Sequence, residues 1–312
     1  MIATPEKALI TVGQGYGNIV MATPTMAALH ALGYSVDVLV ESHHPRAASL
    51  LSGWAALDTI FLNRASLMNS NPCYNAIVRT VWNRSAPLNL GPETLPEPLS
   101  LRDHHEAIVN VSAAKKLGFT GPLPPTHVES ELPLWPLPKN YIVIAPGYGG
   151  SKRADWSRKA WPHWRTFCEQ AHERFRVEVI VLGTEADEEP WMQTADLPWL
   201  HTFCGRTSIR GAAGIIGQSR ALIAVDNGLA HIGGAMNVPV VALFGPTSEI
   251  KNRPLGPRVR LLTTTLACRP CQMTERWVSC GDWRCMNELS PQEVLQNLEN
   301  ILEQACPSSP TK

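Results

Sequence analysis

Short apolar runs that alternate with segments of helical length constrain the fold of this chain most strongly. The runs are bounded by turn-forming residues and are too brief for helices, which is typical of buried strands. We expect strands at Ala8–Val12, Tyr34–Val40, Thr59–Leu62, Ala107–Val111, Tyr141–Ala145, Val177–Leu182, Ala221–Val225, Val238–Phe244 and Val259–Leu262. We expect helices at Asn18–Leu32, Trp161–Arg174, Ser208–Gln218 and Gly228–Met236. This alternation predicts βαβ units, parallel sheets and an α/β fold.

A proline-rich segment divides the chain. With 312 residues the sequence exceeds the size that one hydrophobic core usually serves, so two domains are expected. Residues 121–139, GPLPPTHVESELPLWPLPK, can continue neither a helix nor a central strand and are interpreted as a linker. We predict an N-terminal domain over residues 1–138, linker included, and a C-terminal domain over 139–312. Residues 66–101, rich in Asn, Pro and Ser, are expected to form loops around one or two weak elements.

Charge and apolar patterning exclude some classes of protein. Lys plus Arg and Asp plus Glu are balanced at 27 each, so no net field attracts a polyanion, and nucleic acid is not expected as a partner. No uninterrupted apolar stretch reaches the roughly 18 residues of a membrane span, and the N-terminus lacks the pattern of a signal peptide. We therefore expect a cytoplasmic protein. Peripheral contact with the inner membrane and homo-oligomerisation stay open.

The first expected strand runs into a glycine-rich loop. Gly13, Gly15 and Gly17 alternate before Asn18 and an apolar helix. Glycines at a strand end permit close backbone approach, and a helix N-terminus offers unpaired N–H groups, so the loop is a candidate ligand site. The spacing is not the dinucleotide fingerprint G-x-G-x-x-G. The alternative interpretation is a tight turn in which Asn18 merely caps the helix.

Three loops of the second half are expected at one sheet edge. An apolar strand delivers Asp226 and Asn227 to its carboxyl end, Gly228 opens a helix, and His231 follows one turn later. A second strand ends in FGPT at residues 244–247, and a third is followed by a Gly-rich turn at 147–150 and a basic segment that contains Lys159. Such an edge suits a diphosphate, which requires both hydrogen-bond donors and positive charge. Taken singly, Asp226 is equally a helix cap, His231 a buried core histidine and the basic segment a solvated surface.

The run DNGLAHIGGAMNVPVVALFGPT, at residues 226–247, resembles the signature of glycosyltransferase family 9, the bacterial lipopolysaccharide heptosyltransferases and their relatives. Weaker similarities are spread along the chain. They lie in the first loop with MATP at 21–24, in KAWP at 159–162, in GTE at 183–185 and in GRTS at 205–208.

This resemblance implies a GT-B fold, with two Rossmann-like domains facing across a cleft, the first on the acceptor side. It also implies transfer of heptose or a related sugar, with inversion, from an ADP-heptose-like donor to a glycan, lipid-linked or protein acceptor. Lys159 would contact the phosphates or the donor sugar, Glu185 the ribose or base, and Asp226, Asn227, Gly228 and His231 the diphosphate and sugar. Gly15 and Gly17 belong to the matching first loop. No catalytic divalent ion is expected, because Lys159, His231 and the Gly228 helix can stabilise the leaving diphosphate.

One residue departs from the family pattern. Many members place a general-base Asp directly after the first-loop glycine, where this chain has Asn18, and a carboxamide cannot accept the proton. Glu41, His43 and His44 are substitute candidates, although Glu41 also reads as a plain surface carboxylate. The alternative function is a catalytically silent sugar-nucleotide-binding or scaffold protein. A GT-B epimerase fits less well, because no pair of acid/base carboxylates stands out in the second half.

Four of the eight cysteines cluster between residues 268 and 286. Cys268, Cys271, Cys280 and Cys285 could place four thiolates around zinc or iron, with buried free cysteines as the alternative. A similar motif occurs in a branch of the family that includes autotransporter protein heptosyltransferases, where the reported ion is iron. A four-thiolate site has no open position, so its role would be structural. The segment after it, residues 291–304, is predicted to form an amphipathic closing helix.

Overall fold

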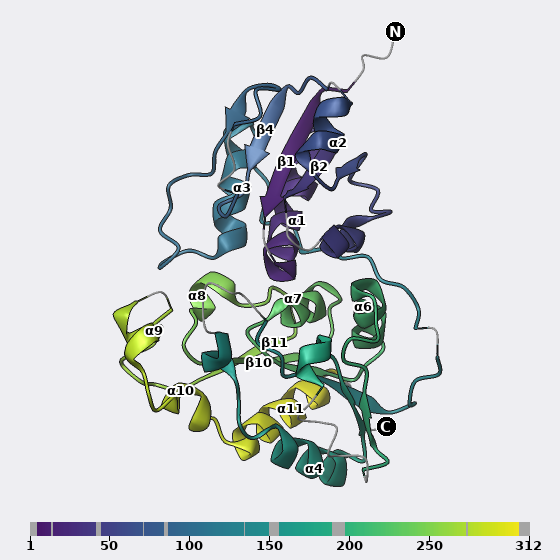
Figure 1. The fold of residues 1–312 in the computed structure, drawn as a ribbon, viewed down its shortest axis with the longest axis vertical. Coiled ribbons are helices and arrows are strands. Elements are labelled where there is room, and N and C mark those ends of the chain that lie inside the picture. Colours follow the sequence, from purple (N-terminus) through teal and green to yellow (C-terminus); the bar gives the residue numbers. More distant parts are fainter. Residues whose placement is uncertain are drawn as a thin grey trace, which may run out of the picture. The chain divides into compact units, whose positions relative to one another are not determined.

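The computed structural model divides the chain into two compact units, Met1–Ser130 and Glu131–Lys312, each described by itself below. Figure 1 shows the elements of both. The described residues are 5–13, 15–41, 45–70, 72–83, 87–133, 135–149, 156–188, 197–272 and 274–305.

The first unit is built on a five-stranded parallel sheet in the order β3-β2-β1-β4-β5. Its elements are β1 (Lys7–Gly13), α1 (Tyr16–Ala31), β2 (Ser35–Glu41), the 3-10 helix η1 (Pro45–Leu51), β3 (Ile60–Phe61), α2 (Arg64–Asn69), β4 (Ala76–Arg79), β5 (Glu93–Thr94) and α3 (Glu106–Lys116). Strand β1 is apolar on both faces because helices cover both. Helices α1 and α3 lie against one another (Figure 1). Ile10 belongs to a core that includes residues of both helices, and Leu9 belongs to a second core with Leu67 of α2.

The second unit holds a six-stranded parallel sheet in the order β11-β10-β9-β6-β7-β8. Its elements are β6 (Tyr141–Ala145), η2 (Trp156–Lys159), α4 (Trp164–Phe175), β7 (Glu178–Val181), η3 (Glu185–Asp187), β8 (Leu200–Thr202), α6 (Ile209–Gly217), β9 (Leu222–Val225), α7 (Gly228–Ala235), β10 (Val240–Phe244), α8 (Glu249–Asn252), β11 (Val259–Thr263), α9 (Glu275–Ser279), α10 (Arg284–Asn287) and α11 (Pro291–Ala305).

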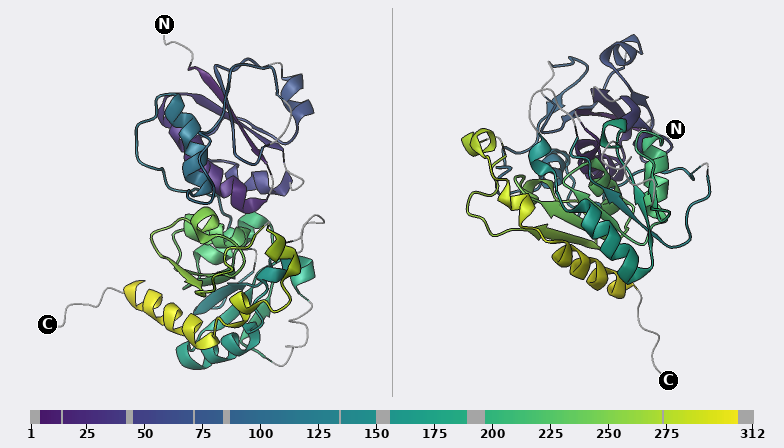
Figure 2. Two further views of the ribbon diagram at one scale, coloured as in Figure 1. Left: turned by 90° about the vertical axis from the view of Figure 1, so that its left-hand side faces the viewer. Right: turned by 60° about the horizontal axis from the view of Figure 1, so that its bottom comes forward.

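Helices also cover both faces of this second sheet. On one face, α4 and α11 lie side by side (Figure 2). Phe167 of α4 and Leu298 of α11 are buried in one core with Ile144 of β6. On the other face α7 packs on β9 and β10, and Gly233 lies close to Leu222 because it has no side chain. The segment expected as a closing helix forms α11, whose first turn carries reciprocal hydrogen bonds between Ser290 and Glu293.

The expected strand at Ala107–Val111 is wrong, because these residues form the first half of α3. The alternation of Val109 and Val111 suggests a strand. However, Ala107, Asn110, Val111 and Ala114 also share a helical face, and all four are buried. The His105 side chain accepts a hydrogen bond from the Ala107 amide and caps the helix. Local capping and packing of the small residues against α1 decide in favour of the helix.

The residues of the expected linker are shared between the units. On one side of Ser130, the Glu129 amide donates to the Leu50 carbonyl, and the His127 amide donates to Thr23 Oγ1 at 2.9 Å. On the other side, the Glu131 amide donates to the Arg210 carbonyl, and the Glu131 carboxylate accepts from Ser208. The chain therefore leaves the first unit and docks on α6 within two residues.

Gly214→Ala should destabilise the second unit, although Ala favours a helix interior over Gly by about 1 kcal/mol. A Cβ at this position would overlap the Glu131 carbonyl oxygen. We expect the free energy of unfolding to fall by about 1 to 3 kcal/mol in urea titrations. Gly217→Ala is the matched control: its Cβ would meet only the far end of the Met236 side chain, so its stability should stay near that of the parent. Equal stabilities of the two variants would contradict the close docking of Glu131.

Candidate functional site

The carboxyl edge of the second sheet has a switch point between β6 and β9. Strands β7 and β8 lie on one side of β6 in the sheet, whereas β9, β10 and β11 lie on its other side. Ligands of open α/β sheets bind at such points. Asn227 joins the two loops there: its Nδ2 donates to the carbonyl oxygens of Ala145 at 2.9 Å and Gly147 at 2.7 Å. Its Oδ1 accepts from the Ala230 amide and so caps α7. One side chain therefore sets the distance between the loop after β6 and the start of α7.

A buried ion pair lies beside this bridge. Lys159 Nζ donates to the Asp226 carbonyl oxygen at 2.5 Å and lies 3.9 Å from its carboxylate. The ammonium also lies 4.8 Å from the centre of the Trp156 ring. Lys159 is 8% exposed and Asp226 7%. Burial lowers the pKa of the Lys159 ammonium, and the Asp226 carboxylate acts in the opposite sense. An anionic ligand at this edge would favour the charged form of Lys159.

Gly228 opens α7, as the sequence predicts, and Asn227 rather than Asp226 is its cap. His231 lies one turn into this helix and is 4% exposed. The loop after β10 adds Thr247, which is fully buried and whose hydroxyl has no hydrogen-bond partner among the described residues. The N-terminus of α7 carries a partial positive charge, which complements an anion.

Glu185 follows β7 on the same edge and opens the short helix η3, with its side chain exposed to solvent. The Asp187 carboxylate accepts from the Thr184 amide and hydroxyl. A Cβ at Gly147 would lie 2.5 Å from that carboxylate. Because Gly147 also accepts from Asn227, contacts run from the turn that carries Glu185 to the cap of α7.

The first unit has its own switch point, between β1 and β4. Gly15 is the N-cap of α1, Gly17 is in the first turn, and Asn18 Nδ2 donates to Glu106 Oε1 at 2.9 Å. Trp82, after β4, donates from Nε1 to Glu106 Oε2 at 2.6 Å. Glu106 is 1% exposed and is the first residue of α3.

Asn18 therefore does not cap α1, which corrects that alternative interpretation of the first loop. The sequence pattern does not single out Glu106, because it predicts a strand over residues 107–111 that follow it. An acidic residue directly after His105 would have been a signal of a helix start.

Glu41 lies beside this loop, since β1 and β2 pair Gly13 with Glu41. It is not a plain surface carboxylate. Its side chain is 13% exposed, forms an ion pair with Arg64, and accepts from Asn83 Nδ2 at 2.8 Å. His43 and His44 lie outside the described residues.

Comparison with known proteins places the chain. The sequence model of glycosyltransferase family 9 (heptosyltransferase) matches residues 102–280, more than half of the chain. The chain belongs to glycosyltransferase family 9. Lipopolysaccharide heptosyltransferase 1 of Pseudomonas aeruginosa is 31% identical over 176 residues, which is 52% of this chain and 48% of that protein. The chain thus spans about half the length of the curated relatives it matches.

Solved structures of heptosyltransferases show the same fold. The Escherichia coli ADP-heptose LPS heptosyltransferase II superposes with a TM-score of 0.73 at 19% identity, covering 96% of this chain and 99% of that one. The dodecameric iron-containing heptosyltransferase TibC, in complex with ADP-D-β-D-heptose, gives a TM-score of 0.67 at 13% identity, covering 97% and 78%. The architecture is therefore GT-B, with two parallel-sheet α/β units. Within the described part of the chain, no helix combines the length and apolar character needed to cross a membrane.

The clustered cysteines of this family 9 chain gather around the turn after β10. The Cys271 amide donates to the Pro246 carbonyl, and Cys285 Sγ would lie 3.2 Å from a Cβ at Gly245. Arg158 donates to the carbonyl of Cys280. Burial raises the pKa of the Cys285 thiol to about 11, and the charges of Cys271, Cys280 and Cys268 add to this effect. In the arrangement of the described side chains, however, no three His, Cys, Asp or Glu residues are grouped closely enough to hold a metal ion.

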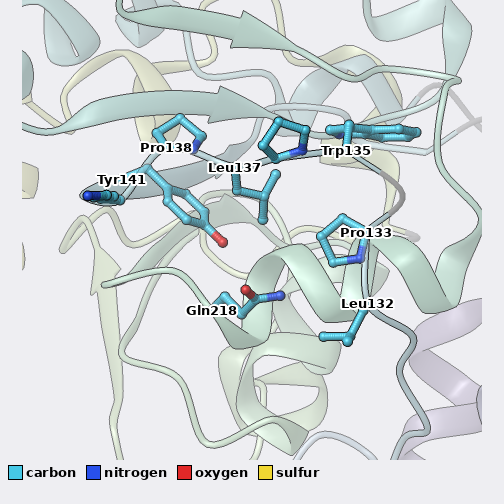
Figure 3. Close-up of a pocket in the computed structure, with 9 residues that line it drawn as sticks. Leu132, Pro133, Trp135, Leu137, Pro138, Tyr141 and Gln218 are labelled. Carbon is cyan, nitrogen blue, oxygen red and sulfur yellow. The ribbon is translucent and has the colours of Figure 1, made fainter.

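A cavity of about 450 Å³ lies away from the carboxyl edge of the second sheet. Its lining includes Tyr141, the first residue of β6, with Trp135, Gln218 and the prolines of the linker (Figure 3). The switch-point loops follow the opposite end of that strand. Position relative to the strand ends, rather than cavity size, therefore identifies the candidate site.

Substitutions at Asn227 should separate its two roles. Asn227→Ser keeps an oxygen for the cap of α7 but loses the bridge to Ala145 and Gly147. Asn227→Asp keeps the cap but turns a carboxylate toward two carbonyl oxygens. We expect both to lower the free energy of unfolding, by about 1 to 3 kcal/mol, with Asp the more harmful near pH 7. Chemical denaturation measures both; an Asp variant as stable as the parent would exclude the bridge.

Proposed function

We propose that this chain is an inverting glycosyltransferase that binds an ADP-heptose-like donor at the carboxyl edge of the second sheet. The observation that carries the proposal is the buried Lys159 ammonium, placed against Asp226 beside the N-terminus of α7. A buried cation next to the N-terminus of a helix is suited to a diphosphate. The names of the relatives, lipopolysaccharide heptosyltransferases, support heptose as the sugar.

In the proposed reaction, a hydroxyl oxygen of the acceptor bonds to the anomeric carbon while the bond from that carbon to the diphosphate breaks. The electron pair leaves on the phosphate oxygen, and ADP departs. Lys159, His231 and the first amides of α7 stabilise the charge that develops there, so a divalent ion is not required. Attack opposite the leaving group inverts the anomeric centre. The hydroxyl proton passes to a carboxylate of the acceptor-side unit, for which Glu41 is the described candidate.

The acceptor is a glycan, a lipid-linked saccharide or a protein hydroxyl. We place the acceptor on the first unit, near Gly15, Gly17 and Asn18 at the start of α1 and Glu41 at the end of β2. We propose a cytoplasmic protein. The alternative function, a catalytically silent sugar-nucleotide-binding or scaffold protein, is favoured by the Asn at position 18.

Lys159→Gln should weaken ADP binding by about 1 to 3 kcal/mol in calorimetric titrations, because a charge-assisted hydrogen bond is lost. His231→Ala should weaken it by a similar amount. Parent affinity for ADP should fall as the pH rises through the lowered pKa of Lys159, and this fall should be absent in Lys159→Gln. Arg165→Gln, which removes an exposed charge on α4, is the control and should bind ADP like the parent.

Turnover separates the two functions. Release of ADP from ADP-heptose, measured with a panel of glycan, lipid-linked and protein acceptors, is expected for a transferase. Tight ADP-heptose binding without ADP release from any acceptor would favour the silent protein. Unchanged ADP affinity in both Lys159→Gln and His231→Ala would contradict the placement of the donor.

We also propose that Cys268, Cys271, Cys280 and Cys285 bind one zinc or iron ion with a structural role. The donor chemistry fits, because burial and the charges of the neighbouring cysteines raise the pKa of the Cys271 and Cys285 thiols, but the four side chains must rotate to meet one ion. A metal bound there would tie the segment from Cys268 to Met286 to the turn at Gly245. The relative TibC is described as iron-containing, which supports iron.

Elemental analysis of the purified protein should find about one zinc or iron per chain. Cys271→Ser should lower both the metal content and the melting temperature, because a buried ligand is lost. Cys73→Ser, at an exposed cysteine of the first unit, should change neither. If the purified protein contains no metal, or if removing the metal with a chelator leaves the melting temperature unchanged, the four cysteines are free thiols instead.

A further inference from the structure

Glu106 is a fully enclosed carboxylate at the switch point of the first sheet. It begins α3, is 1% exposed, and accepts hydrogen bonds on both oxygens, from Asn18 at 2.9 Å and from Trp82 at 2.6 Å. Burying a carboxylate is costly unless donors surround it. The two donors and the start of α3 together offset that cost.

This hydrogen bond fixes which way the Asn18 amide points. A carboxylate can only accept, so it draws the Asn18 NH₂ group toward α3. The other end of the amide, Oδ1, then faces the glycine loop, 3.7 Å from where a Cβ of Gly15 would stand. Asn18 thus presents a hydrogen-bond acceptor to the loop at the sheet edge.

The same contact accounts for the amide at position 18. An Asp there would place two carboxylates within hydrogen-bond distance of one another in a buried site. Such a pair cannot remain doubly ionised and holds a shared proton. Glu106 therefore requires a hydrogen-bond donor in the side chain at position 18, and its negative charge excludes an ionised Asp there.

We propose that Glu106 is a positioning residue that orients Asn18 Oδ1 to accept a hydrogen bond from an acceptor hydroxyl adjacent to the one that attacks. The claim rests on the proposed glycosyl transfer and deepens it on the acceptor side. Glu106 does not touch the substrate; it acts through Asn18. The attacking hydroxyl keeps its own proton for the Glu41 carboxylate, so alignment of the acceptor and removal of that proton belong to different residues in this chain.

A double-mutant cycle, called the stability cycle below, tests the contact between Asn18 and Glu106 by thermal unfolding, without any measurement of activity. Asn18→Asp, Glu106→Gln and the double variant are compared with the parent by thermal unfolding between pH 5 and pH 8. The carboxyl group introduced by Asn18→Asp has a raised pKa beside Glu106, so the melting temperature of this variant should fall as the pH rises through that pKa. The double variant should recover most of the loss, because the amide introduced by Glu106→Gln can donate to the new carboxylate. Melting temperatures whose changes simply add would overturn the pairing.

A kinetic measurement tests the positioning role. With ADP-heptose and the acceptor found active in the ADP-release assay, Glu106→Gln should lower kcat/KM for the acceptor by about tenfold or more, as expected for misplacement of a reacting group. The dissociation constant for ADP should stay within about twofold, since the donor site lies in the other unit. Glu93→Gln, which breaks the ion pair of Glu93 with Arg79 in the same unit, is the control for a purely structural loss. It should lower stability and leave kcat/KM unchanged.

The outcomes are distinguishable. If Glu106→Gln retains parental kcat/KM while the stability cycle shows coupling, the pair is structural only and the positioning role is excluded. If no acceptor releases ADP, the proposed transfer fails and the positioning role fails with it. The stability cycle then still decides whether Glu106 and Asn18 act as a pair.

Discussion

The Asn227 side chain is the contact on which the candidate donor site depends. Strands β6 and β9 are neighbours in the sheet, but the chain continues from them in opposite directions across the sheet. The backbone hydrogen bonds between the strands therefore do not connect the loops that follow them. One amide group makes that connection, by donating to two carbonyls of the first loop and accepting from the first turn of α7. This bridge holds the start of α7, next to Asp226, to the loop after β6.

The first unit solves a similar problem with a carboxylate. At its switch point, Glu106 gathers donors from α1 and from the loop after β4. The two sites differ in what they leave to a ligand. The carboxyl edge of the second sheet offers the buried Lys159 ammonium and the N-terminus of α7, which suit an anion. At the first sheet the donors are turned inward, and an amide oxygen faces the loop, which suits a hydroxyl group.

Much of the candidate site could be predicted from the sequence, because its residues follow apolar runs directly. Asp226, Asn227 and Gly228 come after β9, and the carboxyl ends of parallel strands meet at one edge whatever the loops do. Glu41 was placed at its strand end for the same reason, but its pairing with Arg64 was not predicted, since 23 residues separate the two. Glu106 was missed because Val109 and Val111 mimic a strand, and only packing against α1 shows otherwise.

The sequence by itself determined the fold class, the family and the strand ends that carry the candidate residues, because hydrophobic periodicity and short motifs are local properties. The tertiary structure alone decided which side chains meet. It buried Lys159 against Asp226, turned the Asn18 amide toward Glu106 and gathered the cysteines around the turn after β10. The first two of these contacts join residues 67 and 88 positions apart. Their energies depend on burial and orientation, which a linear pattern does not contain.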